Sequence, residues 1–175
     1  MDLGPVDRIT TDAVGEPGSR VFYLQARQGD ELVTIVVEKE QVQLLGASIL
    51  ELLANVERET GAGPGDEEMD LEEPVEPRWR AGRLSIGLDE DRDLFLLELE
   101  EYQPELEEDD PEQLLLEDPQ TLRLWATREQ MLALSRHGSA VAARGRPRCQ
   151  FCGNPMDPEG HTCPAMNGHR ATPGA

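Results

Sequence analysis

The sequence repeats one order of structural elements, and this repetition constrains the fold more than any other feature. In the first half, β-branched and aromatic residues over 20–26 and 32–37 predict two strands, and scattered apolar residues over 6–14 predict a short strand before them. Apolar residues then recur at helical spacing from about residue 38 to residue 57. The first half is therefore predicted to be a β-β-β-α unit.

The second half is predicted to contain the same elements in the same order. Strands are expected over 79–88, 94–99 and 122–126, and a helix is expected over about 127–144. This helix begins with a capping-box pattern, in which a Thr hydroxyl and a Gln amide bind free backbone amides. A second β-β-β-α unit follows from this reading.

The two units align at an offset of 89 residues. Lys39-Glu40-Gln41 then falls on Arg128-Glu129-Gln130, and Val42 falls on Met131. An internal duplication explains this match together with the shared element order. Because short turns join consecutive strands, we expect an α+β fold with an antiparallel sheet covered by the two helices. Whether the two halves form one sheet or two stays open.

Acidic stretches separate these units. Seven acidic residues lie between Asp66 and Glu76, and 11 lie between Glu98 and Asp118, with Pro and Gly nearby. Such composition favours mobile loops over a packed core. We therefore divide the chain as follows: first unit 1–58, acidic mobile linker 59–77, second unit 78–145 with an acidic loop at about 103–118, zinc knuckle 146–170, tail 171–175.

Charge and hydropathy argue against two broad classes of protein. The chain carries a formal net charge of −20, whereas residues 120–175 hold seven Arg and three acidic residues. Overall acidity argues against a general DNA-binding protein, which must neutralise phosphates. No apolar run reaches the roughly 18 residues of a membrane span, and the first residues do not resemble a signal peptide. A cytoplasmic protein without a membrane partner is expected.

The cysteines near the C-terminus follow the pattern C-x2-C-x8-H-x-C. Its members are Cys149, Cys152, His161 and Cys163. Three thiolates and one imidazole at this spacing are typical of a structural zinc site with four protein ligands. A redox pair of Cys149 and Cys152, and three unliganded thiols, are the alternatives. His169 is a rival fourth ligand, but His161 requires less ordering of the loop.

Several segments resemble an uncharacterised actinobacterial family of unknown function, sometimes described as a repeat protein. They are residues 15–27 and 38–41, Gly145-Arg146-Pro147, the Cys/His segment and Asn167-Gly168. The resemblance implies a cytoplasmic bacterial protein and a pattern C-P-x-C, G-H-x-C-P and N-G-Y. Gln150 departs from the Pro, and His169 stands where Tyr is usual. The resemblance therefore implies Cys149, Cys152, His161 and Cys163 as ligands.

No complete set of catalytic residues is visible. The chain has three His, and neither a nucleophile-elbow motif nor a phosphate-binding P-loop is present. His137 is expected at the surface or end of the second helix. We therefore expect a non-catalytic zinc-containing binding or adaptor protein, with a protein as its partner. The alternative is a single-stranded nucleic-acid-binding protein that uses Arg146, Arg148 and Phe151 of the knuckle; an enzyme of unknown reaction is a more distant one. The oligomeric state stays open.

Overall fold

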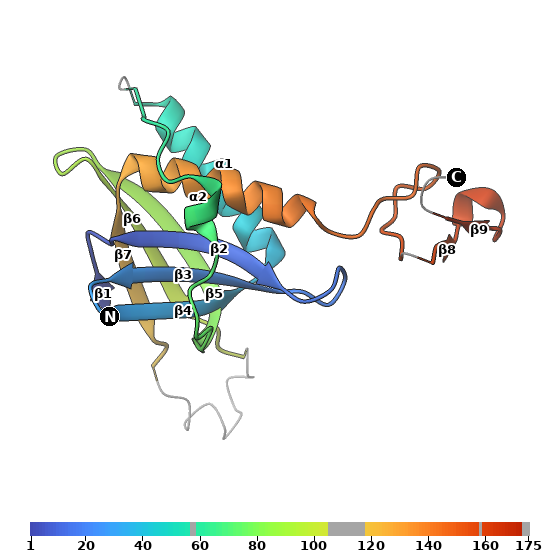
Figure 1. Ribbon diagram of the computed structural model, residues 1–175, viewed down its shortest axis with the longest axis horizontal. Helices are drawn as coiled ribbons and strands as arrows, with labels where there is room; N and C mark the ends of the chain where they lie inside the picture. Colours follow the sequence, from blue (N-terminus) through green and yellow to red (C-terminus); the bar gives the residue numbers. More distant parts are fainter. Residues whose placement is uncertain (57–58, 105–117, 158, 173–175) are drawn as a thin grey trace, which may run out of the picture.

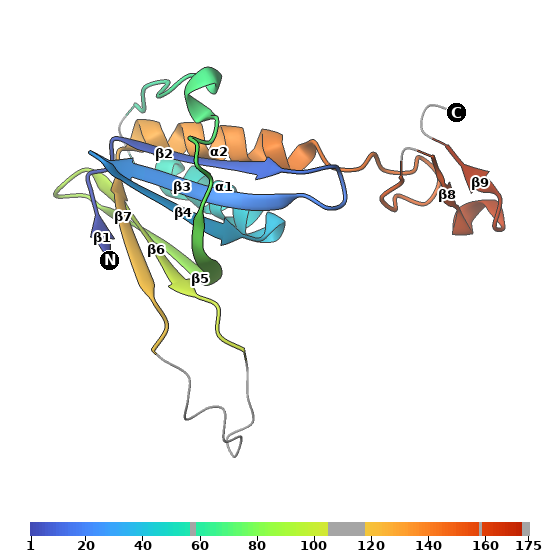
Figure 2. The same ribbon diagram turned by 60° about the horizontal axis from the view of Figure 1, so that its bottom comes forward.

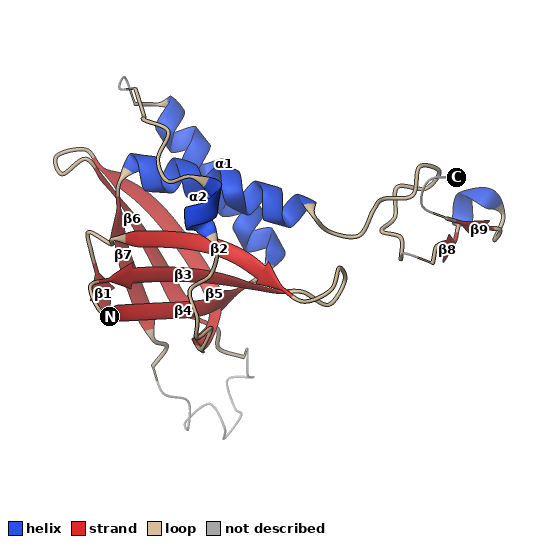
Figure 3. Ribbon diagram, in the orientation of Figure 1, coloured by secondary structure: helices blue, strands red, loops and turns tan. Residues whose placement is uncertain are grey.

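The computed structural model describes residues 1–56, 59–104, 118–157 and 159–172 (Figure 1). Two α-helices lie on one face of a curved sheet, and a small hairpin unit lies beyond the C-terminal end of the second helix (Figures 1 and 3). The elements are β1 (Asp2–Leu3), β2 (Arg8–Val14), β3 (Val21–Gln28), β4 (Glu31–Val37), α1 (Lys39–Ala54), η1 (Asp66–Met69), β5 (Pro77–Asp89), β6 (Leu94–Glu101), β7 (Thr121–Ala126), α2 (Arg128–Ala143), β8 (His161–Thr162), η3 (Pro164–Met166) and β9 (Arg170–Ala171). The expected α+β class, strands and helices are confirmed.

In the described residues, β1 to β7 form one sheet of seven strands in the order β1-β7-β6-β5-β4-β3-β2. The sheet is mixed, so the expected antiparallel sheet is wrong: β4 pairs with β5 in parallel, and β1 pairs with β7 in parallel. Between β4 and β5 the reason is the position of α1, because a helix that links two neighbouring strands returns the chain in the same direction. β1 and β7 lie far apart in the sequence, and no described helix links them directly. The halves therefore share one sheet.

The two edges of the sheet meet at one corner. Only residues 4–7 separate β1 at one edge from β2 at the other. The amide of Val6 donates to the carbonyl of Trp125 at 2.8 Å, and the amide of Asp7 donates to the carbonyl of Arg27 at 2.8 Å. This link therefore bridges β7 and β3 and curls the sheet around the core (Figure 2).

The main core lies between the sheet and the two helices. Alternate residues of each strand face it, as the two-residue period of a strand requires. In β6, for example, Phe95, Leu97 and Leu99 are buried, while the residues between them are half-exposed. Val42 and Met131, which the alignment placed at equivalent positions, are both buried, as expected. Neither helix of the described chain is long and apolar enough to span a membrane.

The same contacts recur at both helices, 89 residues apart. The Gln41 amide oxygen accepts from the Glu38 amide, and its nitrogen donates to the carbonyls of Ala81 and Gly82. In α2, Gln130 makes the corresponding bonds to the Thr127 amide and to the carbonyls of Val6 and Asp7.

The helices cross where Ser135 of α2 donates through its hydroxyl to the carbonyl of Gly46 in α1, at 2.9 Å. These two residues are themselves 89 positions apart. A Cβ on Gly46 would lie 3.4 Å from the Ser135 hydroxyl, in ordinary van der Waals contact, so the two helices pack closely at this crossing.

The acidic segment between α1 and β5 packs on the opposite face of the sheet. A row of buried polar residues, Thr10, Gln25 and Thr34, crosses β2, β3 and β4 there. Gln25 donates to Thr34 and to the carbonyl of Glu72, each at 3.0 Å, and accepts from the Glu72 amide at 2.8 Å. Met69 of this segment is 1% exposed. The segment expected as a mobile linker thus satisfies buried polar groups, and its mobility stays a prediction. The second acidic loop lies largely outside the described residues.

Replacing Met69 by alanine is expected to lower the free energy of unfolding by about 2–5 kcal/mol, since the substitution leaves a cavity under the segment. Urea unfolding followed by circular dichroism measures the change. Glu67→Ala, at an exposed position of the same turn, is the control and should change stability by less than about 0.5 kcal/mol. An unchanged stability in Met69→Ala would show that the segment is not docked.

Candidate metal centre

The first pair of candidate ligands is positioned by a tight turn. The Cys149 amide donates to the carbonyl of Asn154 at 2.9 Å, and the Gly153 amide donates to the carbonyl of Cys149 at 2.8 Å. Gly153 has φ +73°, a conformation that glycine adopts without steric cost. The sequence C-x-x-C-G therefore folds back on itself and places both thiols on one side of the turn.

The second pair lies at the end of the β8–β9 hairpin. His161 is in β8 and pairs with Ala171 of β9, and the amide of Cys163 donates to the carbonyl of His169 at 3.0 Å. The chain after Cys163 turns through η3 and Asn167, which has φ 54°. β9 thus extends to Ala171, one residue into the stretch expected as a tail, and holds β8 in place.

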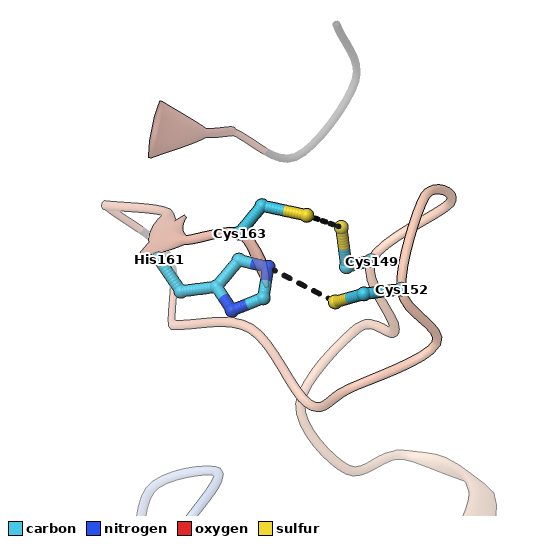
Figure 4. Close-up of side chains that lie close together, drawn as sticks. All are labelled: Cys149, Cys152, His161 and Cys163. Carbon is cyan, nitrogen blue, oxygen red and sulfur yellow. Dashed lines mark hydrogen bonds between the residues drawn. The ribbon is translucent and has the colours of Figure 1, made fainter. Parts of the chain in front are cut away.

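These two turns bring the four expected residues together (Figure 4). One ligand atom from each of Cys149, Cys152, His161 and Cys163 lies within 4.8 Å of every other. The sulfurs of Cys149 and Cys163 are 3.8 Å apart, and the Cys152 sulfur is 3.6 Å from Nε2 of His161. His169, the alternative ligand, is exposed and contributes its backbone carbonyl to the turn instead.

The two measured distances fit a tetrahedral zinc site. Bonds of about 2.3 Å to sulfur set the sulfur–sulfur edge of a tetrahedron at about 3.8 Å. A bond of about 2.0–2.1 Å to imidazole nitrogen sets the mixed edge at about 3.6 Å. The cluster can therefore bind a metal such as zinc, with three sulfur atoms and one nitrogen as ligands.

Two of the thiols differ in acidity. The pKa of Cys149 is lowered to about 6, mainly because the backbone amide of Cys152 hydrogen-bonds to its sulfur, and further because of the hydrogen bond with His161. Burial raises the pKa of Cys163, which is 0% exposed. Without metal, the thiolate therefore forms first at Cys149, and a metal ion must displace the proton from Cys163.

The knuckle, expected over residues 146–170, includes Ala171 of β9 as well and has a very small core of its own. The buried members of this core are Cys149, Met156, Cys163 and Ala171. Two of these four are candidate ligands, so little apolar area is buried besides the cluster itself. A unit of this size normally needs a metal or a disulfide to stay folded. Its cysteines are free thiols in the structure.

Two basic side chains of the knuckle form polar contacts within it. Arg146 forms an ion pair with Asp157 at 3.0 Å, and Arg148 donates to the carbonyl of Gly153 at 3.1 Å. Phe151 is 52% exposed. An aromatic side chain and two cations therefore lie on the outside of the knuckle, where the sequence placed them.

The expectation that His137 lies at the surface or end of the second helix is wrong. Its side chain is 7% exposed, and its Nε2 lies 3.7 Å from a carboxylate oxygen of Asp12 in β2. His137 stands three residues after Leu134 and four before Val141, both of which are buried. This helical spacing was the signal that could have placed it in the interface between α2 and the sheet.

Residues 1–163 match the family described as "Protein of unknown function (DUF3090)". The matched range includes the sheet, both helices and all four residues of the cluster. No curated protein and no solved structure matches the chain.

Proposed function

Since the chain belongs to the DUF3090 family of proteins of unknown function, we propose its role from its own geometry: it is a non-catalytic binding or adaptor protein of the cytoplasm with a structural zinc knuckle. The observation that carries this proposal is the four-residue cluster of Cys149, Cys152, His161 and Cys163. Four protein ligands occupy every position of tetrahedral zinc, so no position is left for a water or a substrate. Such a site stabilises the fold of a binding surface and does not take part in a reaction.

The scaffold of this binding protein is proposed to be a duplicated β-β-β-α unit. Its support is the recurrence of the same contacts at α1 and α2, including the two Gln side chains that donate to backbone carbonyls of β5 and of the β1–β2 link. The strand before each helix also pairs in parallel, β4 with β5 and β7 with β1. Both units thus use one geometry, and the knuckle is the part without a counterpart.

The adaptor role is tested by affinity purification of the tagged chain from its native host, with and without nuclease. Proteins that bind the native chain after nuclease treatment, but not the Cys149→Ser, Cys152→Ser double variant, support the proposal. A control with Arg83→Gln, an exposed change outside the knuckle, should retain them. An identical set of proteins on the native and double-variant chains would contradict a binding role for the knuckle.

A nucleic-acid role is the second candidate, favoured by the exposed Phe151 with Arg146 and Arg148 beside it. We expect no measurable binding of a mixed single-stranded oligonucleotide at about 0.15 M salt, where the Debye length is about 8 Å. The acidic body would repel any strand longer than the basic patch. Fluorescence anisotropy measures this. Micromolar binding that Arg148→Glu abolishes, with zinc retained, would favour the nucleic-acid role.

A further inference from the structure

A cleft of about 420 Å³ opens where the sheet, the start of α1 and the segment leading into the knuckle meet. Its walls come from four separate parts of the sequence. They are the β2–β3 turn with the start of β3, the end of β4 with the start of α1, β5, and the segment from residue 145 to residue 155. The volume lies within the range of small-molecule sites, about 300–1,000 Å³.

Basic residues line this cleft on an otherwise acidic chain. Its charged lining residues are Arg20, Glu38, Lys39, Arg80, Arg146 and Arg148. Five are cations and one is an anion, whereas the chain as a whole has a net charge of −20. The one carboxylate, on Glu38, forms an ion pair with Arg80. A concave site with this excess of one charge concentrates ligands of the opposite charge.

Two of the cations converge on one point. A Cβ atom built on Gly145 would lie 3.2 Å from Nζ of Lys39 and 3.5 Å from a terminal nitrogen of Arg20. A side chain at residue 145 would therefore fill the space that both cations face. The Arg146 side chain lies 3.0 Å from the Cβ position of Gly18. Two glycines thus leave room where three cations approach.

Arg20 is held in place before any ligand arrives. One of its nitrogens donates to the carbonyl of Val141, near the end of α2, at 3.0 Å, and its guanidinium lies over the ring of Phe22 at 5.1 Å. A guanidinium that is already ordered loses less conformational freedom on binding. Beside it, α1 begins at Lys39, and the N-terminal end of a helix carries partial positive charge.

We propose that this cleft binds a small phosphorylated ligand of about nucleotide size, with Arg20, Lys39 and Arg146 on its phosphate groups. Guanidinium and ammonium groups bind phosphate through charge-assisted hydrogen bonds, and several cations around one site match an anion with several charges. Val21, Phe22 and Val37 supply apolar wall for the rest of the ligand. The assignment rests on the proposed binding function and deepens it, because the folded knuckle keeps Arg146 and Arg148 at the cleft.

The single lysine of the chain permits a direct test. Lys39 and the α-amino group of Met1 are its two primary amines, and Met1 lies at the other end of the molecule, bound to Thr121. Limited acetylation with an uncharged reagent, resolved by mass spectrometry, is carried out on the zinc-loaded chain with inorganic pyrophosphate or ADP. Both probes should slow the modification of Lys39 and leave that of Met1 unchanged. Equal modification of Lys39 with and without the probes would overturn the proposal.

Calorimetric titration with the same probes measures affinity. We expect a Kd below about 1 mM for ADP, a loss of at least about tenfold in Lys39→Gln and in Arg146→Gln, and no change in Arg83→Gln, which lies outside the cleft. A single-stranded oligonucleotide that binds more tightly than ADP would overturn the proposal in favour of nucleic acid. Zinc content is measured in each variant: weak ADP binding by a zinc-loaded native chain contradicts the cleft assignment alone, whereas a zinc-free native chain contradicts the structural zinc site.

Discussion

Replacing Cys149 and Cys152 by serine is expected to reduce bound zinc from about one ion per chain to almost none. The change removes two of four ligands, and zinc in such sites is held by deprotonated thiolates that a hydroxyl does not replace. Elemental analysis of protein purified without added metal measures the result. Since Cys149 belongs to the small core of the knuckle and Cys152 packs against that core, we also expect the knuckle to unfold. Unchanged metal content in the double variant would remove the basis for the zinc site.

A matched pair of histidine variants identifies the fourth ligand. His161→Gln should lower zinc affinity strongly, because Nε2 of His161 lies in the cluster, whereas His169→Gln should not, because His169 is exposed. Competition with a chelator gives both affinities. The stability of the main body should be the same in all of these variants, since its core is separate from that of the knuckle. The reverse order of the two affinities would assign the site to His169.

Truncating Met131 to alanine is expected to lower the free energy of unfolding by about 2–5 kcal/mol. Met131 is 0% exposed and lies at the first turn of α2, against the sheet. Total stability of a domain is only about 5–15 kcal/mol, so this loss is a large share of it. Val42→Ala, at the equivalent position of α1, should cost about 2 kcal/mol, because it removes a smaller group.

Urea unfolding measures both changes, and Leu44→Ala is the control. Leu44 is on α1 but is 69% exposed, so its truncation should change stability by less than about 0.5 kcal/mol. If Met131→Ala cost no more than Leu44→Ala, the two aligned positions would not be equivalent parts of one core, and the proposed duplication would lose its packing support.

Local signals predicted most of the fold. The strands and both helices follow from side-chain periodicity, and the cap formed by Thr127 and Gln130 is present as the sequence indicated. Strand β1 was not predicted, because two residues carry no periodicity and their partner, β7, lies more than 100 residues away. The parallel pairs were missed because local periodicity does not give strand direction: that of β5 depends on where α1 returns the chain, and β1 pairs with a strand far away in sequence.

The acidic segment before β5 makes contacts that its composition does not indicate. Its charge predicted a mobile linker, a prediction that stays open. The buried polar residues Thr10 and Gln25 of the sheet require hydrogen-bond partners, and the segment supplies them through Met69 and Glu72. One buried side chain, Met69, adds apolar contact. Neither feature is visible in the segment alone, since the need for partners arises in strands far away in sequence.

The candidate metal residues were predictable because all four lie within fifteen positions of one another and carry specific chemistry. The basic cleft was not predictable. Arg20, Lys39, Arg80 and Arg146 are scattered over more than 120 residues and form no local motif. Only the meeting of β3, β5, the start of α1 and the end of α2 brings them together.

The link between β1 and β2 is synthesised early, but the sheet closes on it late. Residues 1–7 are made before three of their partners in the structure, Thr121, Trp125 and Gln130, which follow more than 110 residues later. That interval lasts several seconds or more at about 5–20 residues per second. During translation the first unit therefore keeps one strand edge unpaired. The sheet is complete only when the start of α2 has emerged and its Gln130 can bind the β1–β2 link.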